Sequence, residues 1–213
     1  MDTLKISKFS ALGFLGILVL HHIINPAIDP SWQPISMYAL GKLGWLMNIA
    51  FFLLGLAFLA LGIYVFKNLK TLGAKIGGGL MILAALGNFL AGVFNPDPID
   101  TLPAHMTTSG NIHTGAAGLL GFFIIAIIFI SFQFLRQTNL KPFKGSVLIV
   151  TALVLITEIA LIAALGTYLS ETNGMLTPET PIGGFGRVVI LACSIWVITT
   201  STALGKAHNQ IKL

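Results

Sequence analysis

Charge is scarce in this sequence: only 9% of its 213 residues are Asp, Glu, Lys or Arg, and seven are acidic. Cysteine is scarcer, because Cys193 is the only one, which excludes an internal disulfide and a thiolate metal cluster. The twelve basic residues give a net charge of +5, but they are scattered and form no basic patch of the kind that binds nucleic acid. We therefore expect no nucleic-acid partner.

Apolar residues dominate instead, at 55% of the chain and a mean hydropathy of +0.91, which is typical of an integral membrane protein. Six runs reach the length of about 20 residues that a membrane-spanning helix needs; they cover approximately 9–25, 43–66, 72–94, 113–135, 145–168 and 186–204. The strands of a membrane barrel would alternate polar and apolar residues. The sequence therefore predicts an all-α protein, a single six-helix transmembrane bundle over residues 1–213.

The basic residues predict the orientation of this bundle. Ten of the twelve lie at the two termini or in the second–third and fourth–fifth connections, whereas only Lys42 and Arg187 lie on the opposite side. Positive charge is enriched in the cytoplasmic connections of membrane proteins. We therefore expect a multi-pass protein of the plasma (inner) membrane, in contact with membrane lipids, with both termini in the cytoplasm and the three longer connections outside.

Glycines occur in two groups, 77–79 and the three-residue series Gly115, Gly118 and Gly121. Small residues let transmembrane helices approach closely where lipid gives no hydrophobic drive for association. Close helix packing is the favoured interpretation of both groups. The alternative is that a lipid or substrate passes close to the backbone there.

Scarce ionisable residues gather at the predicted outer ends of the helices. Asp97 follows the third run, His113 opens the fourth and Arg187 opens the sixth, while Asp29 lies in the first connection. Helix N-termini carry unpaired N–H groups and partial positive charge. With Arg187 they predict a seat for a carboxylate or phosphate, which Asp97 itself could fill.

A second group of polar residues lies deeper. Glu158 is about 20 Å into the fifth run at 1.5 Å per residue, and His21, His22 and Asn88 fall in the same half of the membrane. Ionisable residues in the hydrocarbon region are costly and are functional candidates. The alternative is a His–Glu hydrogen bond that only stabilises the bundle.

Together these residues predict a polar cup that is open to the outside. The segment 29–45 carries prolines and the aromatic residues Trp32, Tyr38 and Trp45, which suit the headgroup region. We expect this segment to lie over the cup as an interfacial cover. Ser36 is expected to cap the next helical segment or, alternatively, to reach into the cup.

Four short motifs carry a family resemblance: "PISMYALG" at 34–41, "FNPDP" at 94–98, "IHTGAAG" at 112–118 and "GGFGR" at 183–187. In this order, with six apolar runs, the chain resembles the prokaryotic membrane family catalogued as domain of unknown function 998. The resemblance covers nearly the whole chain. It implies a rim set of Ser36, Asp97, His113 and Arg187, although Gly186 stands where an acidic residue is expected before the arginine.

The first functional hypothesis is a hydrolase that acts on lipid or lipid-linked headgroups. Asp97, His113 and His22 could hold a zinc ion whose bound water becomes a hydroxide. Alternatively His113, oriented by Asp97, could act as the base that activates Ser36 or water. No His-x-x-x-His or His-Glu-x-x-His spacing is present.

Three other hypotheses stay open. In an anionic-lipid or small-molecule binding or transport protein, Arg187 and Asp29 would meet the ligand and Glu158 with His22 would relay protons. No run predicts the mid-span helix break that builds many transporter sites. A haem or quinone protein would pair His113 with one of the two adjacent histidines. A non-catalytic assembly subunit would use the polar groups only to hold the bundle together.

Overall fold

The structure is a computed structural model that describes residues 3–172 and 175–210, and this part of the chain is helical without any strand. It contains α1 (Thr3–Ile24), α2 (Gly44–Asn68), α3 (Leu72–Val93), α4 (Thr108–Gly118), α5 (Gly121–Arg136), α6 (Lys144–Glu171) and α7 (Ile182–Gln210), with three 3₁₀ turns, η1 (Ile35–Leu40), η2 (Pro103–His105) and η3 (Lys141–Phe143). The predicted all-α class is confirmed.

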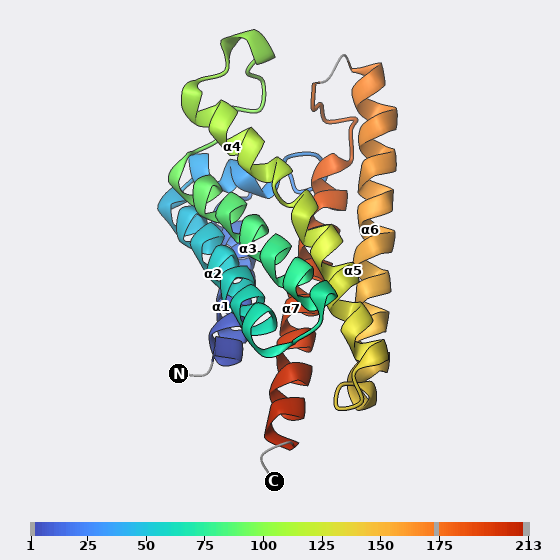
Figure 1. Cartoon of the computed structure of the whole chain (residues 1–213). Coiled ribbons are helices and arrows are strands. Elements are labelled where there is room, and N and C mark those ends of the chain that lie inside the picture. Colours follow the sequence, from blue (N-terminus) through green and yellow to red (C-terminus); the bar gives the residue numbers. More distant parts are fainter. Residues whose placement is uncertain (1–2, 173–174, 211–213) are drawn as a thin grey trace.

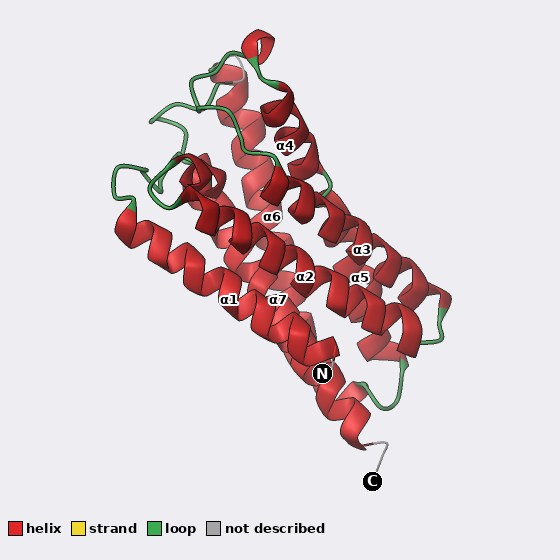
Figure 2. Ribbon diagram, turned by 90° about the vertical axis from the view of Figure 1, so that its left-hand side faces the viewer, coloured by secondary structure: helices red, strands yellow, loops and turns green. Residues whose placement is uncertain are grey.

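Six segments are long and apolar enough to cross a membrane, with α4 and α5 forming one of them together. Both termini therefore lie at one end of the bundle, and the longer connections gather at the opposite end (Figures 1 and 2). We call this opposite end, which holds residues 25–43, 94–107 and 175–181, the distal end. Its placement outside the cell stays a prediction from the charge pattern.

The fourth span departs from its prediction, because it begins at Thr108 and is interrupted at Leu119 and Leu120. There the amides of Leu119, Leu120, Phe122 and Phe123 each donate to the carbonyl three residues earlier, over 2.9–3.1 Å. This i→i−3 pattern is that of a 3₁₀ turn. Gly118 and Gly121 flank the turn, and glycine favours the helix least after proline. The expectation of uninterrupted spans was therefore wrong here.

Only two of the six glycines in these groups lie at close helix contacts. A Cβ on Gly77 would lie 2.9 Å from Ile130 of α5, and one on Gly78 would lie 2.9 Å from the Gly62 carbonyl of α2, so both allow close helix packing as predicted. Around Gly79, Gly115, Gly118 and Gly121, by contrast, a Cβ would meet no neighbouring atom within 4 Å. For these four the packing prediction was wrong, because they border open space.

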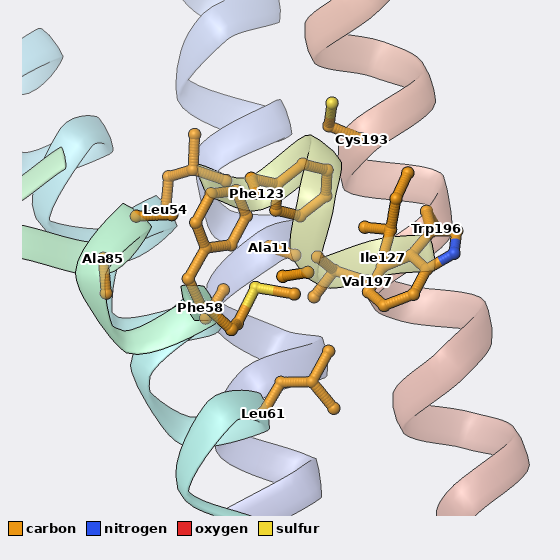
Figure 3. Close-up of a cluster of buried hydrophobic side chains, with 14 of the residues drawn as sticks. Ala11, Leu54, Phe58, Leu61, Ala85, Phe123, Ile127, Cys193, Trp196 and Val197 are labelled. Carbon is orange, nitrogen blue, oxygen red and sulfur yellow. The ribbon is translucent and has the colours of Figure 1, made fainter. Parts of the chain in front are cut away.

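Aromatic side chains form the centre of the bundle (Figure 3). Phe58 of α2 stacks on Phe123 of α5 with ring centroids 4.5 Å apart, and Phe123 meets the edge of Trp196 of α7 at 5.7 Å. All three side chains are at most 2% exposed. The 3₁₀ turn thus places Phe123 at the junction of α2, α5 and α7.

Apolar side chains also cover the outside of the bundle. On α6, Ile149, Ile156 and Ile159 are each at least 64% exposed. On helices long and apolar enough to cross a membrane, such side chains are typical of a surface that faces lipid, so the helices imply a lipid environment.

Candidate functional site

A cavity of about 510 Å³ lies between η1 and helices α2 to α7. Its walls are mostly apolar side chains and glycine, with polar side chains from Ser36, Asn88, His113, Glu158 and Cys193. Pockets of about 300–1,000 Å³ with apolar walls and a few polar groups are typical of small-molecule sites. This cavity, rather than an open polar cup, is the candidate site.

The structure brings together only part of the predicted site. Three predicted residues, Ser36, His113 and Glu158, line the cavity. Four others lie outside its lining and have other partners: Asp29, Asp97, Arg187 and His22.

His113 is fixed in the cavity wall by the end of the preceding helix. Its Nδ1 lies 2.7 Å from the carbonyl oxygen of Phe94, and its ring meets the edge of Phe51. That carbonyl is free because α3 ends at Val93, before Pro96. A carbonyl only accepts, so Nδ1 carries the proton and Nε2 of the neutral ring is left as an acceptor. The ring also interacts with the backbone of Ala91, near the end of the same helix.

Asp97 supports the start of α4 and does not orient His113. Its carboxylate accepts from the amide of Thr107 at 2.8 Å and from the Thr107 hydroxyl at 2.7 Å. Thr107 in turn caps α4 by accepting from the amide of Gly110 at 3.0 Å. A Cβ on Gly110 would lie 2.0 Å from the Asp97 carboxylate, so this position requires glycine. The sequence indicated the wrong helix start, and the cap at Thr107 was missed.

Arg187 of α7 holds the connection between α1 and α2. Its Nε donates to Nε2 of His22 at 2.9 Å, and its Nη2 donates to the hydroxyl of Tyr38 at 3.2 Å. Its Nη1 donates to three carbonyl oxygens, those of Gln33 (2.6 Å), Pro30 (3.0 Å) and Gly183 (3.0 Å). We call Arg187, His22 and Tyr38 the arginine clamp. The guanidinium is therefore held largely by neutral acceptors of the protein itself.

His21 and His22 also help to hold the connection between α1 and α2. Nδ1 of His22 lies 2.7 Å from the Leu18 carbonyl, so it is protonated and leaves Nε2 to accept from Arg187. His21 stacks on Tyr38 at 5.2 Å and accepts from the Asn25 amide at 3.0 Å. Asn25 also bonds the backbone of Lys42 at the other end of the connection. Neither histidine is bonded to Glu158, so the predicted His–Glu pair does not form.

The expected interfacial cover is in fact partly built into the bundle. Tyr38 is fully buried, whereas Trp45 is 59% exposed, as a headgroup residue would be. Ser36 lies inside η1, whose N-cap is Pro34, so it lines the cavity and does not cap. Asp29 accepts from the amide and the hydroxyl of Ser31. These bonds, with a smaller contribution from Arg187, hold the pKa of Asp29 below its usual value.

The suggested zinc ligands are not assembled. Both carboxylate oxygens of Asp97 bind Thr107 and both ring nitrogens of His22 are used, whereas His113 lies in the cavity wall. Across residues 3–172 and 175–210, no three His, Cys, Asp or Glu side chains come close enough to hold a metal ion. The physical reason is that each suggested ligand has a separate structural partner.

Sequence reasoning missed two structural residues. Tyr38 was expected at the headgroups, and Asn25 was counted only as a helix end. Both are polar residues beside a buried histidine in the structure. The motif "PISMYALG" was the available signal for Tyr38.

Six apolar helical spans around a largely apolar cavity define a polytopic membrane protein. The model of the family described as "Protein of unknown function (DUF998)" matches residues 10–203. The chain belongs to this family, which confirms the resemblance of its motifs. No curated protein and no solved structure matches the chain.

Proposed function

We propose that the protein binds an amphipathic small molecule or lipid chain in the cavity between η1 and helices α2 to α7. The observation that carries the proposal is a volume of about 510 Å³ with apolar walls and a buried histidine acceptor, His113. Apolar walls favour a hydrocarbon chain, and a polar group fixes its orientation.

The glycines of the wall support this role. Gly118, Gly121 and Gly186 line the cavity, and a Cβ on any of them would meet no neighbouring atom within 4 Å. A ligand can therefore approach the backbone directly at these positions. The 3₁₀ turn at Leu119 and Leu120 lies between two of these glycines, and irregular backbone at membrane depth occurs where it is buried or lines a cavity.

Photolabelling with an alkyl diazirine tests the proposal on detergent-purified protein. We expect the label on cavity residues of α4, α5 and α7, and clearly less of it in Gly186→Leu, whose side chain takes up part of the cavity. Gly79→Leu is the matched control, because Gly79 also borders open space but does not line the cavity. Equal cavity labelling in both variants would contradict the proposal.

Hydrolysis of a bound lipid or lipid-linked headgroup is the second candidate. It is favoured by the tautomer of His113, whose Nδ1 is fixed by Phe94 and whose Nε2 is an acceptor, as in a general base. Ser36 lines the same cavity and is the candidate nucleophile. Turnover of a fluorogenic lipid ester should be lost in His113→Ala and Ser36→Ala while alkyl labelling remains. Turnover that is unchanged in both variants would exclude this chemistry.

A further inference from the structure

Three polar side chains of the cavity wall, those of Asn88, His113 and Glu158, offer acceptors to a ligand. The Nδ2 of Asn88 donates to the Ala84 carbonyl at 3.1 Å, while its Oδ1 has no partner among the described residues, although the side chain is only 3% exposed. Nε2 of His113, in the same wall, is an acceptor when the ring is neutral. Glu158, also in the wall, has no hydrogen bond within the described part of the chain. An acceptor in a largely apolar wall is stabilised by a donor, so a ligand that supplies donors is favoured.

The charge of the cavity wall also favours a ligand that supplies donors. Glu158 is the only Asp, Glu, Lys or Arg among the described residues that line the cavity. A carboxyl group among lipid-facing helices is stabilised by a donor or cationic partner. Since no lysine or arginine is present in the lining, that partner has to come from outside the chain or be a proton.

Most of the groups that would attract an anion already have partners in the protein. The first turn of α7 borders the cavity, but the amides of Ile182, Gly184 and Phe185 donate to carbonyl oxygens of Thr180, Ser31 and Pro181. Arg187 is held in the arginine clamp. At the start of α4 the carboxylate of Asp97 already binds Thr107. An anionic head would therefore meet the carboxyl group of Glu158 with no free cation beside it.

We infer that the ligand is a cationic amphiphile, a primary amine on a hydrocarbon chain, with its ammonium group on Glu158. The acceptors of His113 and Asn88 lie in the same cavity and suit the remaining N–H groups. The chain of the ligand then occupies the apolar part of the wall. This inference rests on the proposed binding function and specifies its ligand class.

Competition against the alkyl diazirine tests the inference with three probes of equal chain length: dodecylamine, dodecanol and dodecanoate, all below their micellar concentrations. For the wild type we expect dodecylamine to compete at a concentration at least tenfold lower than dodecanoate, with dodecanol between them. In Glu158→Gln the advantage of dodecylamine over dodecanol should disappear. Glu179→Gln, an exposed acid outside the cavity lining, should leave the order of the probes unchanged.

The wild-type order can overturn the inference by itself, because it depends on no variant that has to fold. Dodecanoate competing as well as dodecylamine would overturn the inference while leaving the binding function intact. An amine advantage that persists in folded Glu158→Gln would also overturn it, because the ammonium group would then bind elsewhere. Absence of any cavity label in the wild type would remove the proposed function and this inference together.

Discussion

Arg187 is the residue with the largest number of partners in the site region. Its guanidinium donates five hydrogen bonds: one to His22 of α1, one to Tyr38 of η1, two to carbonyls of the connection between α1 and η1, and one to Gly183 of its own helix α7. Arg187→Met should therefore lower the free energy of unfolding by about 2–4 kcal/mol, since partly buried acceptors lose a charged donor. SDS titration of the purified protein measures this change in the free energy of unfolding.

Arg136→Met is the matched control for the arginine clamp, because Arg136 lies exposed over the ring of Phe132 with the guanidinium 4.6 Å from its centroid. We expect a loss of less than about 1 kcal/mol for this variant. Equal losses in the two variants would show that the clamp contributes nothing specific.

Substitution of Asp97 tests whether the role of this residue is structural or catalytic. Asp97→Ala removes the acceptor for the amide and hydroxyl of Thr107 and should cost about 1–2 kcal/mol of stability. Labelling of the cavity by the alkyl probe should stay within about twofold of the wild type, because Asp97 does not line the cavity. Asp100→Ala, an exposed acid in the same connection, should change neither. Loss of labelling in a stable Asp97→Ala protein would contradict the capping role.

At the scale of residues, the sequence indicated which side chains matter better than what they contact. His113, Ser36 and Glu158 stood out because polar residues are rare in this chain, and all three line the cavity. Their partners could not be predicted. The Phe94 carbonyl that fixes His113 becomes available only where α3 actually ends.

At the scale of helices, Thr151 joins three of them. Its hydroxyl donates to the Val147 carbonyl of its own helix α6 at 2.7 Å. It therefore accepts from Trp196 of α7 at 2.8 Å and from Ser131 of α5 at 2.7 Å. Thr151→Val keeps the shape of the side chain but leaves both donors unpaired, so we expect a loss of about 1–2 kcal/mol in SDS titration.

Thr157→Val is the control on the same helix, because the Thr157 hydroxyl bonds only carbonyls of α6. It should stay within about 0.5 kcal/mol of the wild type. If both variants lost the same free energy of unfolding, the hydrogen bonds of Thr151 to the neighbouring helices would make no measurable contribution to stability.

The helices themselves were predictable, because apolar runs long enough to span a membrane have few alternatives to helix. The interruption of the fourth span was not. The stretch 115–124 is apolar throughout, and its only signal is the spacing of Gly115, Gly118 and Gly121, which is equally typical of close packing. Whether such glycines meet another helix or a cavity depends on side chains distant in the sequence.

At the scale of the whole molecule, orientation in the membrane is the next prediction. With Cys193 replaced by Ser, a cysteine introduced at Asp100 of the distal end should react with a membrane-impermeant maleimide added to intact cells. A cysteine introduced at Lys70, in the short connection between α2 and α3, should react only after the cells are opened. The reverse pattern would invert the topology that the basic residues predict.

The cavity was the feature least accessible to sequence reasoning. The polar groups near the distal end suggested an open cup. In the structure, however, Arg187 and Asp97 form hydrogen bonds with the connections at that end. What remains is largely apolar space with Glu158 and His113 in its wall. A cavity forms where the side chains of several helices leave space between them. The hydrophobic periodicity of a sequence does not indicate where this happens.

Native mass spectrometry of the purified protein tests the central claim most directly, since it counts small molecules bound per chain. Wild type and Gly79→Leu should retain a bound amphiphile after detergent removal in the gas phase, whereas Gly186→Leu, with part of the cavity taken up, should retain much less of it. The same occupancy in all three proteins, or an empty wild type under conditions that preserve added dodecylamine on a control binder, would contradict the account.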